Sequence, residues 1–343
     1  MELRRTWVVQ ARREEAPDAV TLVLKPADGP LPDYLPGQYL SFIFHEYGKE
    51  RRRAYSISSA PETDEDLHIT VKRIPNGTFS TLLTRQVQVG DVLTAAGPFG
   101  QFTLPSPLPK SLVYLAGGSG ITPVMGHLKH LLALPNPPRI LLAYANRDAR
   151  HTIFKSVLDG WAGQHPDILT LQYVFSREPG DGKTAQRHLN PHVLDALLRD
   201  WQPRRRLSNA HYFICAPLGI QRMAEMHLRV LGVPDKRIHH EQFLVDKPPR
   251  QRIPDESRLH RIVLRGAGVA FDTWHNETIL NAALRQGIAL PYTCKSGACF
   301  TCLQPLHTGS VEMDFLQQTQ TAKPGDQVNT CIGYAVSAVV ELG

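Results

Sequence analysis

The cysteines are the feature that most constrains this chain. Four of its five cysteines fall in the C-terminal part, three in one short loop and one far downstream: Cys294, Cys299, Cys302 and Cys331. Structural zinc sites usually show two short C-x2-4-C pairs, whereas this chain has a triplet and a lone cysteine. The pattern therefore favours four thiolates that hold an iron–sulfur cluster, with zinc and disulfides as the alternatives.

The triplet has the C-x4-C-x2-C spacing that, with a fourth distant cysteine, is typical of plant-type [2Fe–2S] sites. Two irons bridged by sulfide need four thiolates on one small object, so a tight loop supplies three and Cys331 supplies the fourth. Gly297 and Ala298 in the loop are small, which lets backbone N–H groups approach the cluster sulfurs and spread their negative charge. We therefore predict a [2Fe–2S] cluster at the four cysteines.

Length and hydropathy predict a multidomain globular protein. A chain of 343 residues is long enough for two or three domains, and its hydrophobic content is 42%. No apolar run approaches the roughly 20 residues that a membrane helix needs, and no apolar segment follows Arg4 and Arg5 as a secretory signal requires. Cluster thiols fit a reducing compartment. We expect a cytoplasmic protein without membrane insertion.

The positive charge is unevenly distributed along the chain. Residues 105–243 carry 17 Lys/Arg against 10 Asp/Glu, a balance of +7, whereas the segments on either side are at −1 and zero. Nucleic-acid binding needs a basic stripe with stacking aromatics. The densest basic runs, 51–53 and 204–206, are short and isolated. We therefore expect no nucleic-acid partner, and the basic middle segment fits an anionic dinucleotide.

Residues 1–104 predict a small antiparallel β-barrel. Short runs of alternating apolar and polar residues, such as 20–24, 39–44 and 67–72, are separated by Gly, Pro and Asp turns. Three motifs follow one another in this segment: R-A-Y-S-I-S at 53–58, N-G-T-F-S at 76–80 and G-P-F-G-Q-F at 97–102. Each alone also fits an ordinary strand or turn.

In this order the three motifs resemble the flavin domain of the ferredoxin–NADP⁺ reductase superfamily. The resemblance implies that Arg53 pairs with a flavin phosphate, Tyr55 lies against the isoalloxazine and Ser56 reaches its N5 edge. A guanidinium fork suits phosphate, and an aromatic ring suits a planar one. The implied flavin-binding residues are Arg53, Ala54, Tyr55, Ser56, Gly77, Thr78 and Ser80. The phosphate loop favours FAD over FMN.

Residues 105–243 predict a parallel α/β domain. The continuous apolar strand 112–116 runs into a G-G-S-G-I-T-P loop and then a helix over 124–134, with Pro123 at its first position. Such a strand–loop–helix unit is a pyrophosphate cradle. The loop resembles the superfamily's nicotinamide-binding motif, which implies binding by Gly117, Gly118, Gly120, Thr122 and Pro123.

Further strands at 140–145, 171–175 and 212–215 complete the predicted sheet. Arg147 and Arg177 each follow a strand, at the edge where open α/β sheets bind ligands. Residues Ser176-Arg177-Glu178 resemble the stretch that holds the 2′-phosphate in NADPH-using relatives, so NADPH is favoured. NADH stays the alternative, because an Asn-Arg pair like 146–147 also occurs in NADH-using members.

Two short motifs near the end of this domain, at 215–217 and 241–243, indicate where its redox centre lies. Cys215-Ala216-Pro217 resembles the family's C-G-P motif, with alanine in place of glycine, and implies that Cys215 lies near the nicotinamide C4. Glu241 and Phe243 resemble the E-x-F ending whose aromatic ring covers the flavin or nicotinamide. We expect a helix over 223–231 and a strand over 238–243.

Residues 244–257 are rich in Pro and charge and predict a linker. Residues 258–343 resemble the plant-type ferredoxin β-grasp, with a hairpin at 260–271, a helix at 276–284 and strands at 310–313 and 335–342. The predicted domains are therefore a FAD-binding barrel (1–104), an NAD(P)-binding α/β domain (105–243), the linker and the [2Fe–2S] domain.

This domain order resembles the reductase components of multicomponent oxygenases. The resemblance implies an NAD(P)H oxidoreductase that passes electrons through FAD and the cluster to a separate diiron or Rieske oxygenase, with Ser56 and Cys215 as catalytic residues. Two alternatives stay open: a non-catalytic flavin/iron–sulfur redox sensor, and a reductase for another kind of redox protein.

Overall fold

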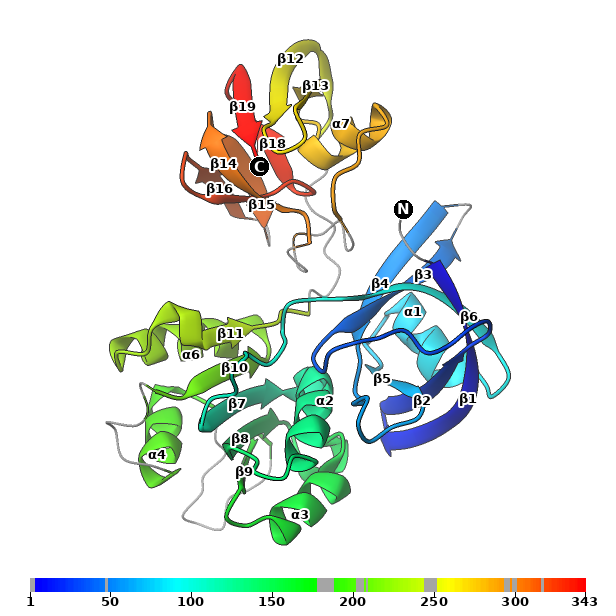
Figure 1. The fold of residues 1–343 in the computed structure, drawn as a ribbon, viewed down its shortest axis with the longest axis vertical. Coiled ribbons are helices and arrows are strands. Elements are labelled where there is room, and N and C mark those ends of the chain that lie inside the picture. Colours follow the sequence, from blue (N-terminus) through cyan, green and yellow to red (C-terminus); the bar gives the residue numbers. More distant parts are fainter. Residues whose placement is uncertain are drawn as a thin grey trace. The chain divides into compact units, whose positions relative to one another are not determined.

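The computed structural model in Figure 1 describes residues 4–46, 49–177, 188–201, 207, 209–243, 252–292, 297, 301–315 and 318–343. The chain forms two compact units, Met1–Phe243 and Leu244–Gly343. Within the described ranges, no helix is both long and apolar enough to cross a membrane.

The first part of the first unit is an antiparallel sheet of six strands in the order β4-β3-β6-β1-β2-β5. The strands are β1 (Arg4–Ala16), β2 (Ala19–Pro26), β3 (Tyr39–Glu46), β4 (Lys49–Ser56), β5 (Leu67–Lys72) and β6 (Val92–Phe99). A bridge between Ile57 and Ile69 joins the chain just after β4 to β5, so the two edge strands meet and the sheet closes. Inward-facing Trp7, Leu22 and Phe42 are fully buried in its core. The predicted barrel is confirmed.

A helical segment crosses the barrel between β5 and β6. It consists of the short helix α1 (Thr78–Thr81) and the π-helical turn η1 (Leu82–Gln86). Phe79 and Leu83 from this segment are buried in the barrel core. The N–H groups at the start of α1 have no side-chain cap, so they stay available to a ligand.

The second part of the first unit is a parallel sheet in the order β11-β10-β7-β8-β9, covered by helices on both faces (Figure 1). The strands are β7 (Ser111–Gly117), β8 (Arg139–Asn146), β9 (Leu169–Phe175), β10 (His211–Cys215) and β11 (Ile238–His240). The helices are α2 (Ile121–Leu132), α3 (Lys155–Gln164), α4 (Pro191–Trp201) and α6 (Leu218–Val230), with 3-10 turns η2 (Gly118–Gly120), η3 (Ala149–His151) and η4 (Asp235–Arg237).

The central strand β7 explains this two-sided arrangement. Its residues are apolar without alternation, and both of its faces are buried. Tyr114 lies in the core with α2 and α3, whereas Val113 and Leu115 lie in the core with α4 and α6. The predicted parallel α/β domain is confirmed.

The second unit contains the helix α7 (Ile279–Arg285), a five-stranded sheet in the order β13-β12-β19-β14-β17 and a three-stranded sheet in the order β16-β15-β18. Its strands are β12 (Asp255–Leu264), β13 (Val269–His275), β14 (Leu303–Thr308), β15 (Val311–Phe315), β16 (Gln318–Ala322), β17 (Gln327–Asn329), β18 (Gly333–Ala335) and β19 (Val339–Leu342). Ile279 and Leu280 of α7 pack into one core with Ile262 and Val340 of the larger sheet.

Several predicted element boundaries differ from the structure. Helix α2 begins at Ile121, so Pro123 is its third residue instead of its first. Helix α6 begins five residues before the predicted position, at Leu218. Helix α7 begins later than predicted, because Asn276 has a positive φ and the Thr278 side chain caps the helix by accepting from the Asn281 N–H. The predicted strand 335–342 is interrupted between β18 and β19.

Candidate functional site

Two of the predicted flavin-binding motifs meet on the barrel. The guanidinium of Arg53, on β4, lies 4.9 Å from the centre of the Phe79 ring in α1. Phe79 also stacks on Phe44, which anchors the start of α1 to the sheet. A cation and the uncapped N–H groups of a helix start therefore face one region, which fits a pyrophosphate group.

The remaining residues of these motifs divide into two groups. Gly77 precedes α1, and a Cβ there would lie 2.6 Å from the Ser80 Oγ, so only glycine fits without a shift. The Ser80 hydroxyl accepts from the Ile74 N–H and is buried, so it closes the loop. Tyr55 is half-buried and meets Phe42 edge to face, whereas Ala54 is exposed. Arg53 and Tyr55 thus share one face of β4, and exposed Ala54 lies on the other.

The glycine loop after β7 is closely packed against the end of β10. A Cβ on Gly120 would overlap the carbonyl oxygen of Cys215 and come within 3.2 Å of its Sγ. A Cβ on Gly117 would lie 2.6 Å from the Pro217 ring. The Thr122 hydroxyl donates to the carbonyl of Ser119 within the loop. The loop therefore needs small residues so that its backbone can lie against β10.

Ser56, Cys215 and Glu241 come together from three different segments. The Ser56 hydroxyl at the end of β4 donates to the Glu241 carboxylate at 3.4 Å. The Glu241 N–H donates to the carbonyl of Ile214, so Glu241 follows β11 directly beside the end of β10. The Cys215 thiol is 1% exposed. The two predicted catalytic residues thus flank one carboxyl group.

The protein keeps this group of side chains uncharged at neutral pH. Burial raises the pKa of Glu241 to about 8, and the hydrogen bond from Ser56 opposes the shift only in part. Burial raises the pKa of the Cys215 thiol well above its usual range, and the nearby Glu241 adds to the shift. Cys215 is therefore a protonated thiol and not a thiolate nucleophile.

The predicted adenosine-side arginines lie on neighbouring loops. The N–H of Arg177 donates to the carbonyl of Arg147 at 2.8 Å, and the N–H of Ser176 donates to the carbonyl of Asn146. Arg177 is exposed. The Arg147 guanidinium instead pairs with Asp18 at 3.4 Å and Asp148 at 3.6 Å. Glu178 of the predicted Ser-Arg-Glu stretch lies outside the described residues. Phe243 is described and is 39% exposed.

Lys72 and Asp18 are two site residues that the motifs did not single out, and the E-x-F motif marked Glu241 without its contact to Ser56. Lys72 ends β5, and its Nζ lies 3.8 Å from the position of a Cβ on Gly118 and 3.9 Å from the Asp18 carboxylate. The sequence presents Lys72 only as the last residue of an alternating strand and Asp18 as part of a turn. The contact between them and the glycine loop depends on how the barrel packs on the parallel sheet.

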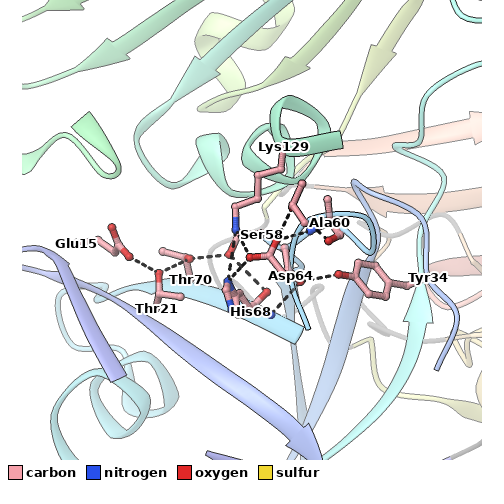
Figure 2. Close-up of polar contacts among 11 residues, drawn as sticks. Glu15, Thr21, Tyr34, Ser58, Ala60, Asp64, His68, Thr70 and Lys129 are labelled. Carbon is pink, nitrogen blue, oxygen red and sulfur yellow. Dashed lines mark hydrogen bonds and ion pairs between the residues drawn. The ribbon is translucent and has the colours of Figure 1, made fainter. Parts of the chain in front are cut away.

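Figure 2 shows the polar contacts that hold this packing in place. Lys129 of α2 reaches down to the barrel, where its Nζ donates to both oxygens of Asp64 at 2.8 and 3.0 Å. The Asp64 carboxylate also accepts from the Ala60 N–H, and His68 lies 3.5 Å from both charged partners. A separate hydroxyl chain runs through the barrel wall by way of Glu15, Thr21, Thr70 and Ser58. The junction is therefore an ordered polar contact between the two parts of the first unit.

Two of the four predicted cluster ligands are described, and they lie at adjacent strand ends. Cys302 directly precedes β14, and Cys331 follows β17. These two strands are antiparallel neighbours, with Leu303 opposite Asn329. Both cysteines are buried. The Gly297 N–H donates to the Cys331 sulfur at 3.2 Å, as expected for a backbone that spreads cluster charge. Cys294, Cys299 and Ala298 lie outside the described residues. The described sulfurs and N–H donor fit an iron–sulfur cluster.

Models of known protein families match three consecutive parts of the chain. The oxidoreductase FAD-binding domain matches residues 9–104, the oxidoreductase NAD-binding domain matches residues 114–226, and the 2Fe-2S iron-sulfur cluster binding domain matches residues 262–336. The matches confirm the three predicted domain types. They also confirm FAD, NAD(P)H and a [2Fe–2S] cluster as the cofactors.

Two similar proteins and one similar structure extend over most of the chain. NADPH oxidoreductase of Mycobacterium tuberculosis is 31% identical and covers 94% of this chain and 80% of its own length. The 1,2-phenylacetyl-CoA epoxidase of Escherichia coli has a subunit that is 32% identical, with 88% of this chain and 86% of that subunit covered. The structure of phthalate dioxygenase reductase, described as modular for electron transfer from pyridine nucleotides to [2Fe-2S], has a TM-score of 0.62 at 22% identity and covers 99% of this chain and 97% of its own.

Proposed function

Because this chain belongs to the ferredoxin–NADP⁺ reductase superfamily, in the branch with a C-terminal plant-type 2Fe-2S domain, we propose that it is the reductase component of a multicomponent oxygenase. It is an NAD(P)H-dependent oxidoreductase whose electrons leave through the cluster to a separate oxygenase protein. The names of two similar proteins, an epoxidase subunit and a dioxygenase reductase, support an oxygenase as the acceptor.

The observation that carries this proposal is the convergence of Ser56, Glu241 and Cys215. These side chains come from β4, the segment after β11 and the end of β10, and they join the barrel to the nucleotide edge of the parallel sheet. A bound flavin supplies the change from two-electron to one-electron transfer. The chain itself holds the reacting groups between Ser56 and Cys215, and Glu241 holds a proton at its carboxyl beside the Ser56 hydroxyl.

The phosphate-binding part of the proposal involves backbone and cations together. The loop 117–120 offers its backbone at the end of β7, and Lys72 brings a cation to Gly118. We place the dinucleotide's pyrophosphate there, because N–H groups and a lysine both favour an anion. Exposed Arg177 and the neighbouring Ser176 support NADPH as the preferred coenzyme, since a guanidinium suits the additional 2′-phosphate.

The exit of electrons is assigned to the second unit. Cys302 and Cys331, with Cys294 and Cys299, hold the cluster in this proposal, and the Gly297 N–H supports the Cys331 sulfur. Cysteines that ligate a cluster favour a reducing compartment, in keeping with the predicted cytoplasmic location.

The test supplies the holoprotein with NADPH or NADH as the electron donor and with ferricyanide, cytochrome c or a purified terminal oxygenase of the same organism as the acceptor. We expect turnover within the common range of about 1–10³ s⁻¹, a higher kcat/KM with NADPH, and oxygenase reduction. Bound flavin that stays oxidised in excess NADPH and NADH would identify a sensor instead. Rapid reduction of cytochrome c without any reduction of the oxygenase would identify a different redox partner.

A further inference from the structure

A three-charge cluster lies at the junction of the barrel and the nucleotide edge. Its members are Asp18 in the turn between β1 and β2, Lys72 at the end of β5 and Arg147 after β8. The Asp18 Oδ2 lies 3.4 Å from the Arg147 Nη2 and 3.9 Å from the Lys72 Nζ. Arg147 also has Asp148 at 3.6 Å from its Nε, so Asp18 is the carboxylate that the two cations share.

The cluster lies beside the loop that faces the dinucleotide's phosphates. The Lys72 Nζ is 3.8 Å from the Cβ position of Gly118. Arg147 follows the strand β8, whose Ala145 pairs with Gly117 of the same loop. The Tyr144 hydroxyl of β8 donates to the Gly118 carbonyl and fixes this side of the loop. An anion bound at the loop therefore shares its cations with Asp18.

The Asp18 carboxylate is held in place by its backbone. Ala16 and Ala19, on either side of the turn, are buried in the core that contains Ile121 and Val124 of α2. The Asp18 carbonyl accepts from the Arg73 N–H at 2.7 Å, which joins the turn to the end of β5. A substitution that changes only the charge of Asp18 leaves these supports intact.

Hydrogen bonding in the cluster is incomplete among the described residues. The Asp18 Oδ1 and the Arg147 Nε are both buried there without a hydrogen-bond partner. Burial lowers the pKa of Lys72, Asp18 and Asp148 oppose the shift, and Arg147 adds to it. Two cations that share one imperfectly bonded carboxylate can accept a second anion.

We propose that Asp18 is a built-in counter-anion that competes with the dinucleotide's pyrophosphate for Lys72 and Arg147. The inference rests on the proposed function and adds a residue that sets how tightly the coenzyme binds. Without a nucleotide, Asp18 neutralises the two cations and holds the barrel to β8. When the pyrophosphate binds, it either shares Lys72 and Arg147 with Asp18 or displaces Asp18 from them. Part of the attraction between the pyrophosphate and the two cations is therefore offset. The device keeps coenzyme affinity lower than the two cations alone would give.

The test is the affinity of the FAD- and cluster-containing protein for ADP-ribose, which has the pyrophosphate but no 2′-phosphate. We expect Asp18→Asn to lower the Kd about ten-fold at low salt, and the gain to shrink at 0.5 M NaCl, because exposed charges are screened. The Kd for 2′-AMP, which has the 2′-phosphate but no phosphate at the 5′ position, is expected to change less than two-fold. Titration calorimetry measures both constants.

Asp64→Asn is the matched control, since it removes the charge of another ion pair between the barrel and the α/β part, remote from Lys72. If Asp64→Asn tightens ADP-ribose binding equally, the gain comes from a looser junction and the proposal is wrong. An unchanged or higher Kd for ADP-ribose in Asp18→Asn, or tightening confined to 2′-AMP, also overturns it. A wild-type protein that binds none of ADP-ribose, NADP⁺ and NAD⁺ would refute the proposed function itself.

Discussion

At the scale of single residues, Glu241 has the most strongly altered chemistry in the redox site. Its carboxyl accepts from Ser56 and lies next to the buried Cys215 thiol. Because burial raises its pKa to about 8, the carboxyl is neutral at pH 7 and can hold a proton where electrons enter. The Cys215 thiol is protonated as well. Ser56, Glu241 and Cys215 are thus polar but uncharged at neutral pH.

Glu241→Gln should remove a pH dependence from the stability of the first unit. The folded-state pKa, about 8, lies above the ordinary value of 4.5, so the folded protein keeps a proton that the unfolded chain loses. Glu241 therefore stabilises fully below pH 4.5, and its contribution falls as pH rises to 8, by at most about 1.4 kcal/mol per pH unit. Thermal unfolding at pH 6, 7 and 8 measures the effect. An equal decline of Tm from pH 6 to pH 8 in the wild type and in Glu241→Gln would contradict this prediction.

Motifs located Ser56 and Cys215, but they did not predict that both flank Glu241. The Ser56–Glu241 contact joins residues 185 positions apart. Such a contact depends on how two parts of the fold pack, which local spacing does not encode. Lys72 was missed for the same reason, since its strand shows ordinary alternation.

At the scale of elements, α2 determines how the barrel meets the parallel sheet. Gly126 lets the helix approach closely, because a Cβ there would lie 3.0 Å from the Ser59 carbonyl. One helical turn away, Lys129 pairs with Asp64 of the barrel. His127 is fully buried, and its Nε2 lies 2.9 Å from the Phe102 carbonyl and 3.1 Å from the Pro36 carbonyl. His127 and Lys129 of α2 thus bind carbonyl and carboxylate oxygens on the barrel side.

His68→Gln should reduce the loss of stability in acid. Burial lowers the pKa of His68 to about 4, and nearby Lys129 adds to this shift, whereas the ordinary value is 6.5. The unfolded chain therefore binds a proton between pH 6.5 and 4 that the folded protein does not, and stability falls as pH falls, by at most about 1.4 kcal/mol per pH unit. The drop in Tm of the first unit from pH 7 to pH 5 is expected to be smaller in the variant.

His45→Gln is the control for this measurement, because His45 is exposed on β3. It should show the full wild-type drop. If the His68 variant loses as much Tm as wild type and the control, then the neutral His68 side chain does not contribute to acid sensitivity.

Gly120→Ala tests the turn between β7 and α2. The added methyl would overlap the Cys215 carbonyl, which is part of the backbone and has no room to move away. The glycine loop should therefore shift from β10 and displace the nucleotide-binding edge from Cys215. We expect kcat/KM for NADPH to fall at least ten-fold while FAD stays bound, since the barrel is not changed. Ser119→Ala in the same turn should have little effect, and equal losses in both variants would rule out the close approach as the cause.

At the scale of the whole molecule, the order of domains was predictable, whereas the packing of a residue in the predicted linker was not. Each domain has its own periodicity and its own motif, so the barrel, the parallel sheet and the cluster domain follow from local patterns. Whether a residue of the predicted linker packs against a domain depends on tertiary contacts. Arg252, in the predicted linker, pairs with Asp314 and Glu312 and lies 4.4 Å from the Tyr334 ring centre. This arginine belongs to the packed second unit, although its sequence surroundings are rich in Pro and charge.

The serial order of the cofactors leads to a prediction for Cys302→Ser. The thiol is buried, and the Cys302 carbonyl accepts from the Thr330 N–H and hydroxyl, so serine fits the backbone but removes a cluster ligand. We expect the flavin domain to reduce ferricyanide with NADPH at near the wild-type rate, and reduction of the oxygenase to fall at least 100-fold. Ser310→Ala, in the same unit, should keep both rates. Oxygenase reduction at the normal rate in a Cys302→Ser protein that lacks the cluster's absorbance would show that electrons leave by another route.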